Sequence, residues 1–423
     1  MCYVDHDAQP LPGAVEGAHL HRQASAHTRA DGGPGLERAG PRDLAEGAVT
    51  GQVDDQPVET FVAAGAQTGD RRGFAGDRGR RGAGSRIAAP TPVRSGGSRL
   101  PHFLWEQHCC LPLLPSARIA DLARYPSGSY LSVNVGYSAQ STADSLALIR
   151  QYRADAHADG RFRLVHKHSD IGDAETIALA FDLEDSGPLG GDLDNVARFY
   201  ELGVRSLLPT YNHANAAGCG CLDTEDTGLT AYGRDLVRAL NDVGMFVDGS
   251  HCSRRTALDL ATHSQAPVIY SHSNFAALWE HPRNITDEQA KACAATGGVI
   301  GLNGVGIFLG HNGVDAAGAR IEALADHVEH GAALVGIEHI GIGSDYSFDA
   351  ADFNDMLAQH PEAFSESYTK WGPLQWVPPE DLLGLGAVPG LDEVLTRRGF
   401  SAADRAAVFG GNFSRVAAQV WRD

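Results

Sequence analysis

The sequence predicts an α/β fold, a (β/α)8 TIM barrel with an irregular or disordered N-terminal segment. Eight short apolar or β-branched runs occur between about residues 102 and 342, and amphipathic stretches with helical spacing separate most of them. Polar residues suited to catalysis follow several of the runs, at the strand ends where a barrel places its chemistry. An open doubly wound sheet is the alternative, but no glycine-rich phosphate loop follows the first run.

The first part of the chain has a different composition. Residues 1–98 are rich in Gly, Ala, Arg and Pro, as in Asp70-Arg71-Arg72-Gly73, and show almost no apolar periodicity. Such a segment cannot bury enough surface to offset its ordering entropy, so we expect it to be irregular. Its preference for Arg over Lys also suggests a mistranslated start or reading frame. The expected domains are therefore an irregular or disordered segment over residues 1–98 and a barrel over residues 99–423.

The expected barrel elements follow the chain in order. Short apolar runs of this kind are typical of buried parallel strands, and stretches with a 3.6-residue period are typical of the covering helices. We predict strands at residues 103–105, 130–135, 177–183, 204–208, 245–247, 268–270, 299–302 and 337–342. We predict helices at residues 144–153, 193–202, 232–243, 254–262, 286–295 and 319–334.

A long loop is expected after the last strand, over residues 347–380. It is unusually aromatic, with Phe353, Tyr368, Trp371 and Trp376 among its residues. Such a loop could wall the active site or lie at a subunit contact.

Composition excludes several classes of partner. The net charge of -19 argues against nucleic acid and acidic membranes, and no apolar run reaches the length of a membrane span. The seven cysteines show no framework spacing, and no secretory signal is visible at the N-terminus. We therefore expect a cytoplasmic protein acting on a small molecule.

Two apolar runs end in the same way, which points to a metal. His251 follows one run and His272 follows another, and neutral imidazole is a common zinc ligand. His108 and Cys110 follow the first run, and Glu184 and Asp345 follow two others. Zinc accepts all these ligand types, and a carboxylate can bridge two ions. The sequence thus predicts a metal-dependent hydrolase.

At these residues the chain resembles the membrane (renal) dipeptidase family of zinc peptidases. The resemblance covers residues 103–420 and depends on the order and spacing of five motifs. They are Val247-Asp248-Gly249-Ser250-His251, Val268-Ile269-Tyr270-Ser271-His272-Ser273, Arg283-Asn284-Ile285, Gly341-Ile342-Gly343-Ser344-Asp345 and Gly411-Asn412-Phe413-Ser414-Arg415-Val416. The resemblance implies zinc-dependent hydrolysis of a dipeptide by a hydroxide between two zinc ions, in a possible homodimer.

The resemblance also implies roles for individual residues. His108 would bind the first zinc, Glu184 would bridge the ions, and His251 and His272 would bind the second. Arg283 would hold a substrate carboxylate. Asp345 would be the general acid–base.

Two positions depart from the family pattern. Its Asp-Gly-His-Asn-Asp motif is here Glu106-Gln107-His108-Cys109-Cys110, so Cys110 replaces an aspartate ligand. Thiolate binds zinc well, but the change could equally leave the first site weak or empty. The substrate-contacting histidine is replaced by Tyr211, which could donate a hydrogen bond instead, or His213 could reach in.

These departures keep two alternatives open. One is a mononuclear zinc amidohydrolase acting on another small amide or lactam, with His251 and His272 as surviving ligands. The other is a catalytically degenerate barrel that acts as a binding protein.

Overall fold

The computed structural model describes residues 102–359 and 365–422. The expectations for residues 1–98, and with them the domain boundary, lie outside this part and stay predictions.

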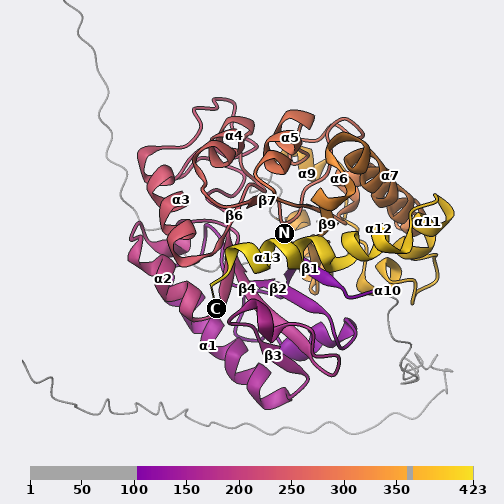
Figure 1. Ribbon diagram of the computed structural model, residues 1–423, viewed down its shortest axis with the longest axis horizontal. Helices are drawn as coiled ribbons and strands as arrows, with labels where there is room; N and C mark the ends of the chain where they lie inside the picture. The colour runs from indigo at the N-terminus through magenta and orange to yellow at the C-terminus, as the bar shows by residue number, and fades with distance from the viewer. Residues whose placement is uncertain (1–101, 360–364, 423) are drawn as a thin grey trace, which may run out of the picture. The chain divides into compact units, whose positions relative to one another are not determined.

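A parallel barrel forms the centre of the described chain (Figure 1). Eight strands hydrogen-bond in the order β7-β6-β5-β4-β2-β1-β9-β8, and a bridge between Tyr270 and Ile300 joins the two ends of this path. Every strand pair is parallel, with β3 added beside β4 and β10 beside β1. The strands are β1 (Trp105–Cys110), β2 (Tyr130–Asn134), β3 (Phe162–Leu164), β4 (Ile177–Leu183), β5 (Val204–Leu207), β6 (Phe246–Asp248), β7 (Val268–Ile269), β8 (Ile300–Leu302), β9 (Ile340–Ile342) and β10 (Tyr346–Ser347).

The eight strands of the ring are the eight that the sequence predicts. The first differs in extent: β1 runs to Cys110, so His108 and Cys110 lie within the strand and not after it. The short strands β3 and β10 were not predicted, because three and two residues carry no apolar run. The barrel prediction is confirmed.

Helices cover the outside of the barrel (Figure 1). Several begin at Ser or Thr, whose hydroxyl accepts from an unpaired backbone N–H of the first turn, as Ser141 and Thr286 do. They are α1 (Thr142–Asp159), α2 (Asp194–Glu201), α3 (Ala231–Val243), α4 (Arg254–His263), α5 (Asp287–Ala295), α6 (Gly306–Leu309), α7 (Ala317–Val335), α8 (Ala350–Gln359), α9 (Glu366–Thr369), α10 (Pro379–Leu382), α11 (Leu391–Arg397), α12 (Ala402–Ala406) and α13 (Asn412–Val420). None of the helices in the described part is long and apolar enough to cross a membrane.

The C-terminal helix α13 closes the end of the barrel where the strands begin. Trp105, at the start of β1, stacks on Tyr130 with ring centroids 3.8 Å apart and packs against Phe413 and Trp421. These rings belong to one buried apolar cluster between α13 and the strand starts. Access to the barrel is therefore from the opposite end, where the strands finish.

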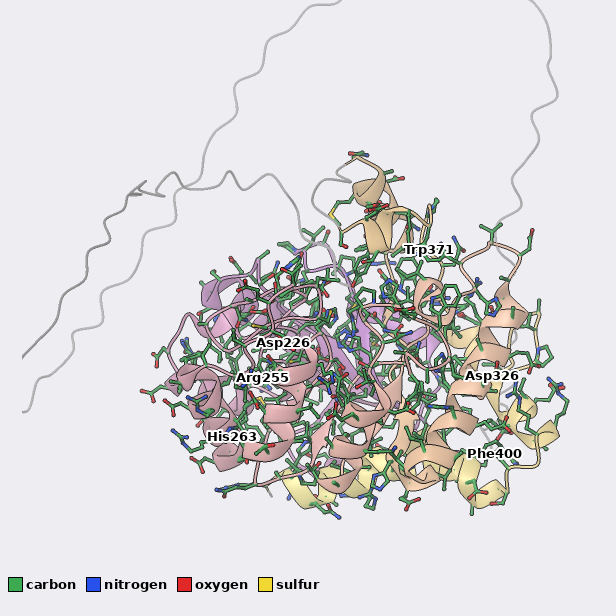
Figure 2. The ribbon with its side chains drawn as sticks, turned by 90° about the horizontal axis from the view of Figure 1, so that it is seen from above. Asp226, Arg255, His263, Asp326, Trp371 and Phe400 are labelled. Carbon is green, nitrogen blue, oxygen red and sulfur yellow. The ribbon has the colours of Figure 1, made fainter. Side chains whose placement is uncertain are left out.

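The segment after β10 is partly helical, so the prediction of a long loop over residues 347–380 is wrong in detail. It contains α8 and α9 and packs on α6 through an apolar cluster that includes Phe308, Phe353 and Tyr368. Figure 2 shows Trp371 on this segment, away from the yellow C-terminal helices. Its buried aromatic side chains explain the aromatic composition.

Candidate metal centre and active site

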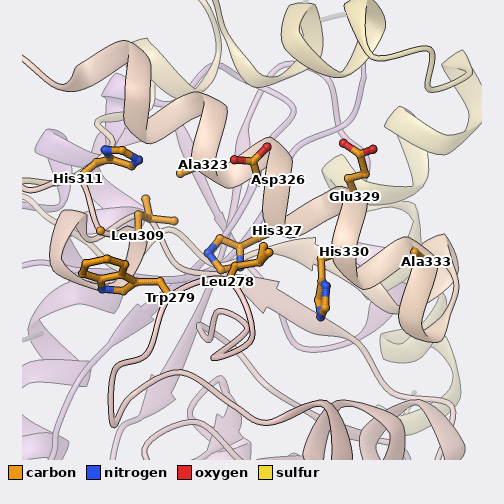
Figure 3. Close-up of a pocket in the computed structure, with 11 residues that line it drawn as sticks. Leu278, Trp279, Leu309, His311, Ala323, Asp326, His327, Glu329, His330 and Ala333 are labelled. Atoms are coloured by element: carbon orange, nitrogen blue, oxygen red, sulfur yellow. The ribbon is translucent and has the colours of Figure 1, made fainter.

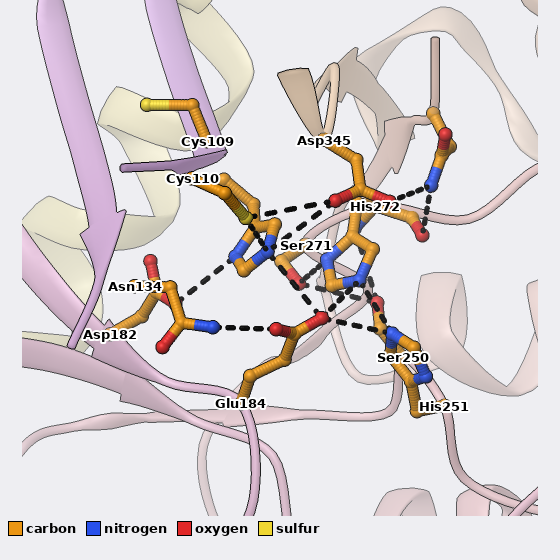
Figure 4. Close-up of polar contacts among 12 residues, drawn as sticks. Cys109, Cys110, Asn134, Asp182, Glu184, Ser250, His251, Ser271, His272 and Asp345 are labelled. Carbon is orange, nitrogen blue, oxygen red and sulfur yellow. Dashed lines mark hydrogen bonds and ion pairs between the residues drawn. The ribbon is translucent and has the colours of Figure 1, made fainter. Parts of the chain in front are cut away.

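Strands β1 and β4 bring the first two candidate ligands together. His108 lies in β1, and Glu184, labelled in Figure 4, follows β4. Both side chains are fully buried. His108 Nε2 is 3.6 Å from Glu184 Oε1. Asn134, at the end of β2, donates to the other carboxylate oxygen, Glu184 Oε2, at 2.5 Å. The glutamate therefore presents one fixed oxygen to the barrel axis.

A single carboxylate connects the loops that carry the other two histidines. Asp248 Oδ1 accepts from the backbone N–H groups of Ser250 and Ser271, both at 3.0 Å. Ser250 Oγ also accepts from the backbone N–H of His272 at 3.1 Å. Because both loops are tied to the end of β6, His251 and His272 are held side by side, with their Nε2 atoms 3.0 Å apart.

Strained backbone marks the same region. Three described residues other than glycine adopt positive φ: Asn212 at 58°, His251 at 62° and Asp345 at 55°. Such a conformation costs on the order of 1–3 kcal/mol for a residue with a Cβ and persists where the surroundings impose it. All three lie at strand ends around the buried histidines, which is typical of a functional site.

The candidate ligands converge on Glu184 Oε1. The Nε2 atoms of His251, His272 and His108 lie 3.0, 3.5 and 3.6 Å from this oxygen. Ligand atoms of His108, Glu184, His272 and Asp345 all lie within 4.8 Å of one another. The structure thus brings four of the predicted residues into one buried cluster, with His251 beside it.

Hydrogen bonds on the outer ring nitrogens leave the inner ones free to bind a cation. His108 Nδ1 is 3.0 Å from Asp182 Oδ1, and His251 Nδ1 is 2.7 Å from Asn212 Oδ1. Since these oxygens only accept, each Nδ1 carries the proton, and neutral imidazole then has a lone pair on Nε2. Both lone pairs face the cluster, as in metal sites whose ligands are oriented by outer hydrogen bonds.

The electrostatics favour a positive charge at this point. Burial lowers the pKa of His251 to about 3, so its ring is neutral and able to bind a metal. Burial acts in the same direction on His108, but the carboxylates of Asp182 and Glu184 outweigh it and raise its pKa well above the usual value. The carboxylates therefore stabilise a cation next to His108, whether a proton or a metal ion.

The donor set fits zinc. Glu184 Oε1 is fully buried and makes no hydrogen bond within the described residues, although three imidazole nitrogens surround it. Leaving a buried carboxylate oxygen unsatisfied costs about 1–3 kcal/mol or more, which a bound cation would remove. Imidazole nitrogen with carboxylate oxygen is a typical zinc ligand set.

Cys110 lies at the edge of this cluster. Its Sγ is 3.5 Å from His108 Nε2 and 3.9 Å from Asp345 Oδ1. The side chain therefore faces the same point as His108, as a residue two positions along one strand must. Cys110 is disulfide-bonded in this structure, and only its reduced thiolate could bind a metal, so its role as a ligand stays a prediction.

Asp345 is oriented by an asparagine. Asn303, after β8, donates to Asp345 Oδ2 at 3.0 Å. Asp345 Oδ1 remains on the cluster side, 3.8 Å from His108 Nε2. Oδ2 is thus held by Asn303, and Oδ1 faces the cluster of candidate ligands.

Arg283 is buried beside the histidines, with 2% of its surface exposed. Its Nη2 donates to the carbonyl of His272 at 3.0 Å, and its guanidinium lies 5.4 Å from the centre of the Phe308 ring. Arg283 Nε has no hydrogen-bond partner within the described residues. It lines a cavity of about 330 Å³ together with His251. A buried cation with an unused donor can bind a carboxylate.

The two candidates after β5 point in different directions. The Tyr211 ring stacks on His251, with centroids 4.3 Å apart. His213 does not reach the cluster: its side chain is 68% exposed and pairs with Asp223 at 3.3 Å. The positive φ of Asn212 lies between the two residues, where the chain turns, so Tyr211 contacts His251 and His213 does not.

Sequence reasoning missed the residues that orient the ligands. Asp182 holds His108, Asn134 holds Glu184, Asn212 holds His251 and Asn303 holds Asp345. Only Asp182 had a visible signal, because it lies two residues before Glu184 and so shares its face of β4.

A second cavity lies apart from this cluster. It has a volume of about 500 Å³ and lies beside α7, where Trp279, His311 and His327 line it (Figure 3). Two acidic residues on its rim, Asp326 and Glu329, form ion pairs with Arg398. None of the candidate ligands lines it.

Comparisons with known proteins identify relatives of this chain. An uncharacterised protein of Klebsiella pneumoniae, encoded in the region 5′ of pqqA, is 34% identical over 221 residues, which cover 50% of this chain and 80% of that protein. An uncharacterised dipeptidase of Schizosaccharomyces pombe is 37% identical over 174 residues, which cover 40% of this chain but only 41% of that protein. The chain thus spans less than half of that dipeptidase.

Solved structures share the fold. The crystal structure of an amidohydrolase from Pseudomonas aeruginosa superposes with a TM-score of 0.65 at 25% identity, covering 76% of this chain and 97% of the other. Residues 125–360 match the family described as membrane dipeptidase, peptidase family M19. This match covers more than half of the chain and includes Glu184, His251, His272 and Asp345, whereas His108 lies before it. The chain therefore belongs to the membrane dipeptidase family, peptidase family M19.

Proposed function

We propose that the protein is a metallo-dipeptidase that hydrolyses the amide bond of dipeptides with two zinc ions. The observation that supports this most directly is Glu184 Oε1, buried among three imidazole nitrogens at the open end of a barrel of the dipeptidase family. His108 and Cys110 would hold one ion, His251 and His272 the other, and Glu184 would bridge them. When bound, zinc supplies Lewis acidity that lowers the pKa of water and polarises a carbonyl.

The protein's own residues would bind the substrate and transfer the proton. Arg283 would hold the carboxylate of the substrate and so fix its position along the barrel mouth. Tyr211 would donate its hydroxyl hydrogen to the oxygen of the scissile carbonyl. Asp345 Oδ1 would take the proton of the attacking water and pass it to the leaving nitrogen, while Asn303 holds Oδ2.

The first experiment measures zinc per chain by elemental analysis and the hydrolysis of a dipeptide panel by the same protein. We expect about two zinc ions and hydrolysis that a chelator abolishes and zinc restores. About one ion, with hydrolysis of lactams or other amides only, would support the mononuclear amidohydrolase instead. A folded protein with no bound metal and no hydrolysis would support the binding protein.

Arg283→Met is expected to raise KM for dipeptides by roughly tenfold to a hundredfold with a smaller change in kcat, because a charge-assisted contact to the substrate is lost. Steady-state kinetics check this. Arg254→Met is the matched control, since Arg254 lines the same cavity but is exposed and pairs with Glu288. An unchanged KM for Arg283→Met would contradict the proposal that Arg283 holds the substrate carboxylate.

Cys110→Ala is expected to lower the zinc content from about two to about one per chain, because a ligand of the first ion is removed. Elemental analysis and kinetics check this. Cys110→Asp then separates two cases: lost activity means that the thiolate is a working ligand, and gained activity means that the natural first site is degenerate.

The cellular setting is also part of the proposal. Among the described cysteines, five are thiols and Cys110 is disulfide-bonded; the thiols are Cys109, Cys219, Cys221, Cys252 and Cys293. A reducing compartment such as the cytoplasm would keep Cys110 as the thiol that the proposed metal site requires. The homodimer implied by the family resemblance stays a prediction, which light scattering on the purified protein tests.

A further inference from the structure

The order of strands places two parts of the site across the barrel from each other. In the closed ring of eight strands, β2 is the fourth neighbour of β7 in either direction, so the two lie opposite one another. Arg283 belongs to the segment between β7 and β8, and Tyr137 follows β2. A dipeptide held by its carboxylate at Arg283 would therefore extend across the metal cluster and place its amino-terminal residue toward Tyr137.

Tyr137 is tied closely to the cluster. The residue before it, Gly136, accepts from the backbone N–H of Glu184 at 2.9 Å. The Tyr137 ring packs on Tyr211 with centroids 4.9 Å apart and an interplanar angle of 54°. Tyr211 in turn stacks on His251 at 4.3 Å. The two tyrosines thus form a continuous aromatic wall from the β2 end to the histidine cluster.

The two rings of this aromatic wall keep surface and hydroxyl groups that a ligand could contact. Both side chains are only partly buried, and neither hydroxyl forms a hydrogen bond within the described residues. Aromatic faces and edges bind other aromatic and large apolar groups better than they bind small polar ones.

We propose that Tyr137 and Tyr211 receive the side chain of the amino-terminal residue, so that the enzyme prefers dipeptides whose first residue is aromatic or large and apolar. This inference rests on the proposed dipeptidase function. Tyr137 is then a specificity-determining residue that neither holds metal nor moves a proton.

The test compares kcat/KM for L-Phe-Gly and Gly-Gly in the zinc-loaded full-length protein. We expect a preference for L-Phe-Gly of roughly tenfold or more. Tyr137→Ala should reduce this ratio roughly tenfold, whereas Tyr137→Phe should keep it, because the ring and not the hydroxyl makes the contact. Tyr232→Ala, on α3 in the outer helical layer, is the matched control and should keep the ratio.

A binding measurement separates recognition from turnover. In an Asp345→Asn background, calorimetry should show tighter binding of L-Phe-Gly than of Gly-Gly, and Tyr137→Ala should remove the difference. Hydrolysis of both dipeptides without preference, or a preference that Tyr137→Ala leaves intact, would overturn the inference alone. Failure of the wild-type protein to hydrolyse any dipeptide would overturn the proposed function and this inference with it.

Discussion

Asp345→Asn is expected to lower kcat for dipeptide hydrolysis by about 10²- to 10⁴-fold while the zinc content stays unchanged. The substitution keeps the shape of the side chain and its contact with Asn303 but removes the negative charge, and with it the capacity to accept a proton from water. The measurements are steady-state kinetics and elemental analysis on the same preparation.

The zinc content decides what Asp345 does. Its Oδ1 lies among the candidate ligands, so a variant that loses zinc would identify Asp345 as a ligand and contradict its role in proton transfer. Unchanged turnover would contradict both roles. Asp326→Asn is a suitable control. Asp326 is an exposed acid on α7 that pairs with Arg398, so this substitution should leave kcat and zinc content unaltered.

Glu184→Gln is expected to have the second large effect, a zinc content of one ion per chain or less and a loss of activity of roughly a thousandfold or more. The three imidazole nitrogens all lie within 3.6 Å of its Oε1. Glutamine occupies the same space but lacks the negative charge that would bridge two cations.

The neighbouring residue supplies the control for this variant. Asp185 accepts from the backbone N–H of Gly187 at 2.5 Å and from Asn215, so its carboxylate is used away from the cluster. Asp185→Asn should keep both zinc ions. Retention of two zinc ions by Glu184→Gln, or equal metal loss in the two variants, would contradict the bridging assignment. Circular dichroism on both variants confirms that the fold is kept.

The fold could be predicted because its signals are local. Each strand of the barrel is a short apolar run, and the alternation with helices gives the topology without any knowledge of contacts. The errors in the fold prediction also concern single short segments. The short strand β10 carries no apolar run, and the aromatic residues of 347–380 did not reveal that this segment forms helices α8 and α9.

The site could be predicted in part. His251 and His272 were recognisable because two matched strand ends deliver the same residue type, and Glu184 and Asp345 because carboxylates follow buried strands. The structure brings these four residues around the barrel axis. Sequence could not distinguish His213 from Tyr211, because the turn at Asn212 exposes His213 and places Tyr211 against His251, and a positive φ at an asparagine leaves no clear pattern in the sequence.

The sequence by itself determined the barrel, the strand ends that carry polar residues and the chemical type of the candidate ligands. Only the tertiary structure decided which nitrogen of His108 and of His251 faces the cluster and which carboxylate oxygen of Glu184 and of Asp345 is left to bind a cation. Those choices depend on Asp182, Asn134, Asn212 and Asn303, whose partners lie between 39 and 74 residues away along the chain. A single hydrogen bond between such distant residues leaves no periodic pattern in the sequence, whereas the burial of a strand does.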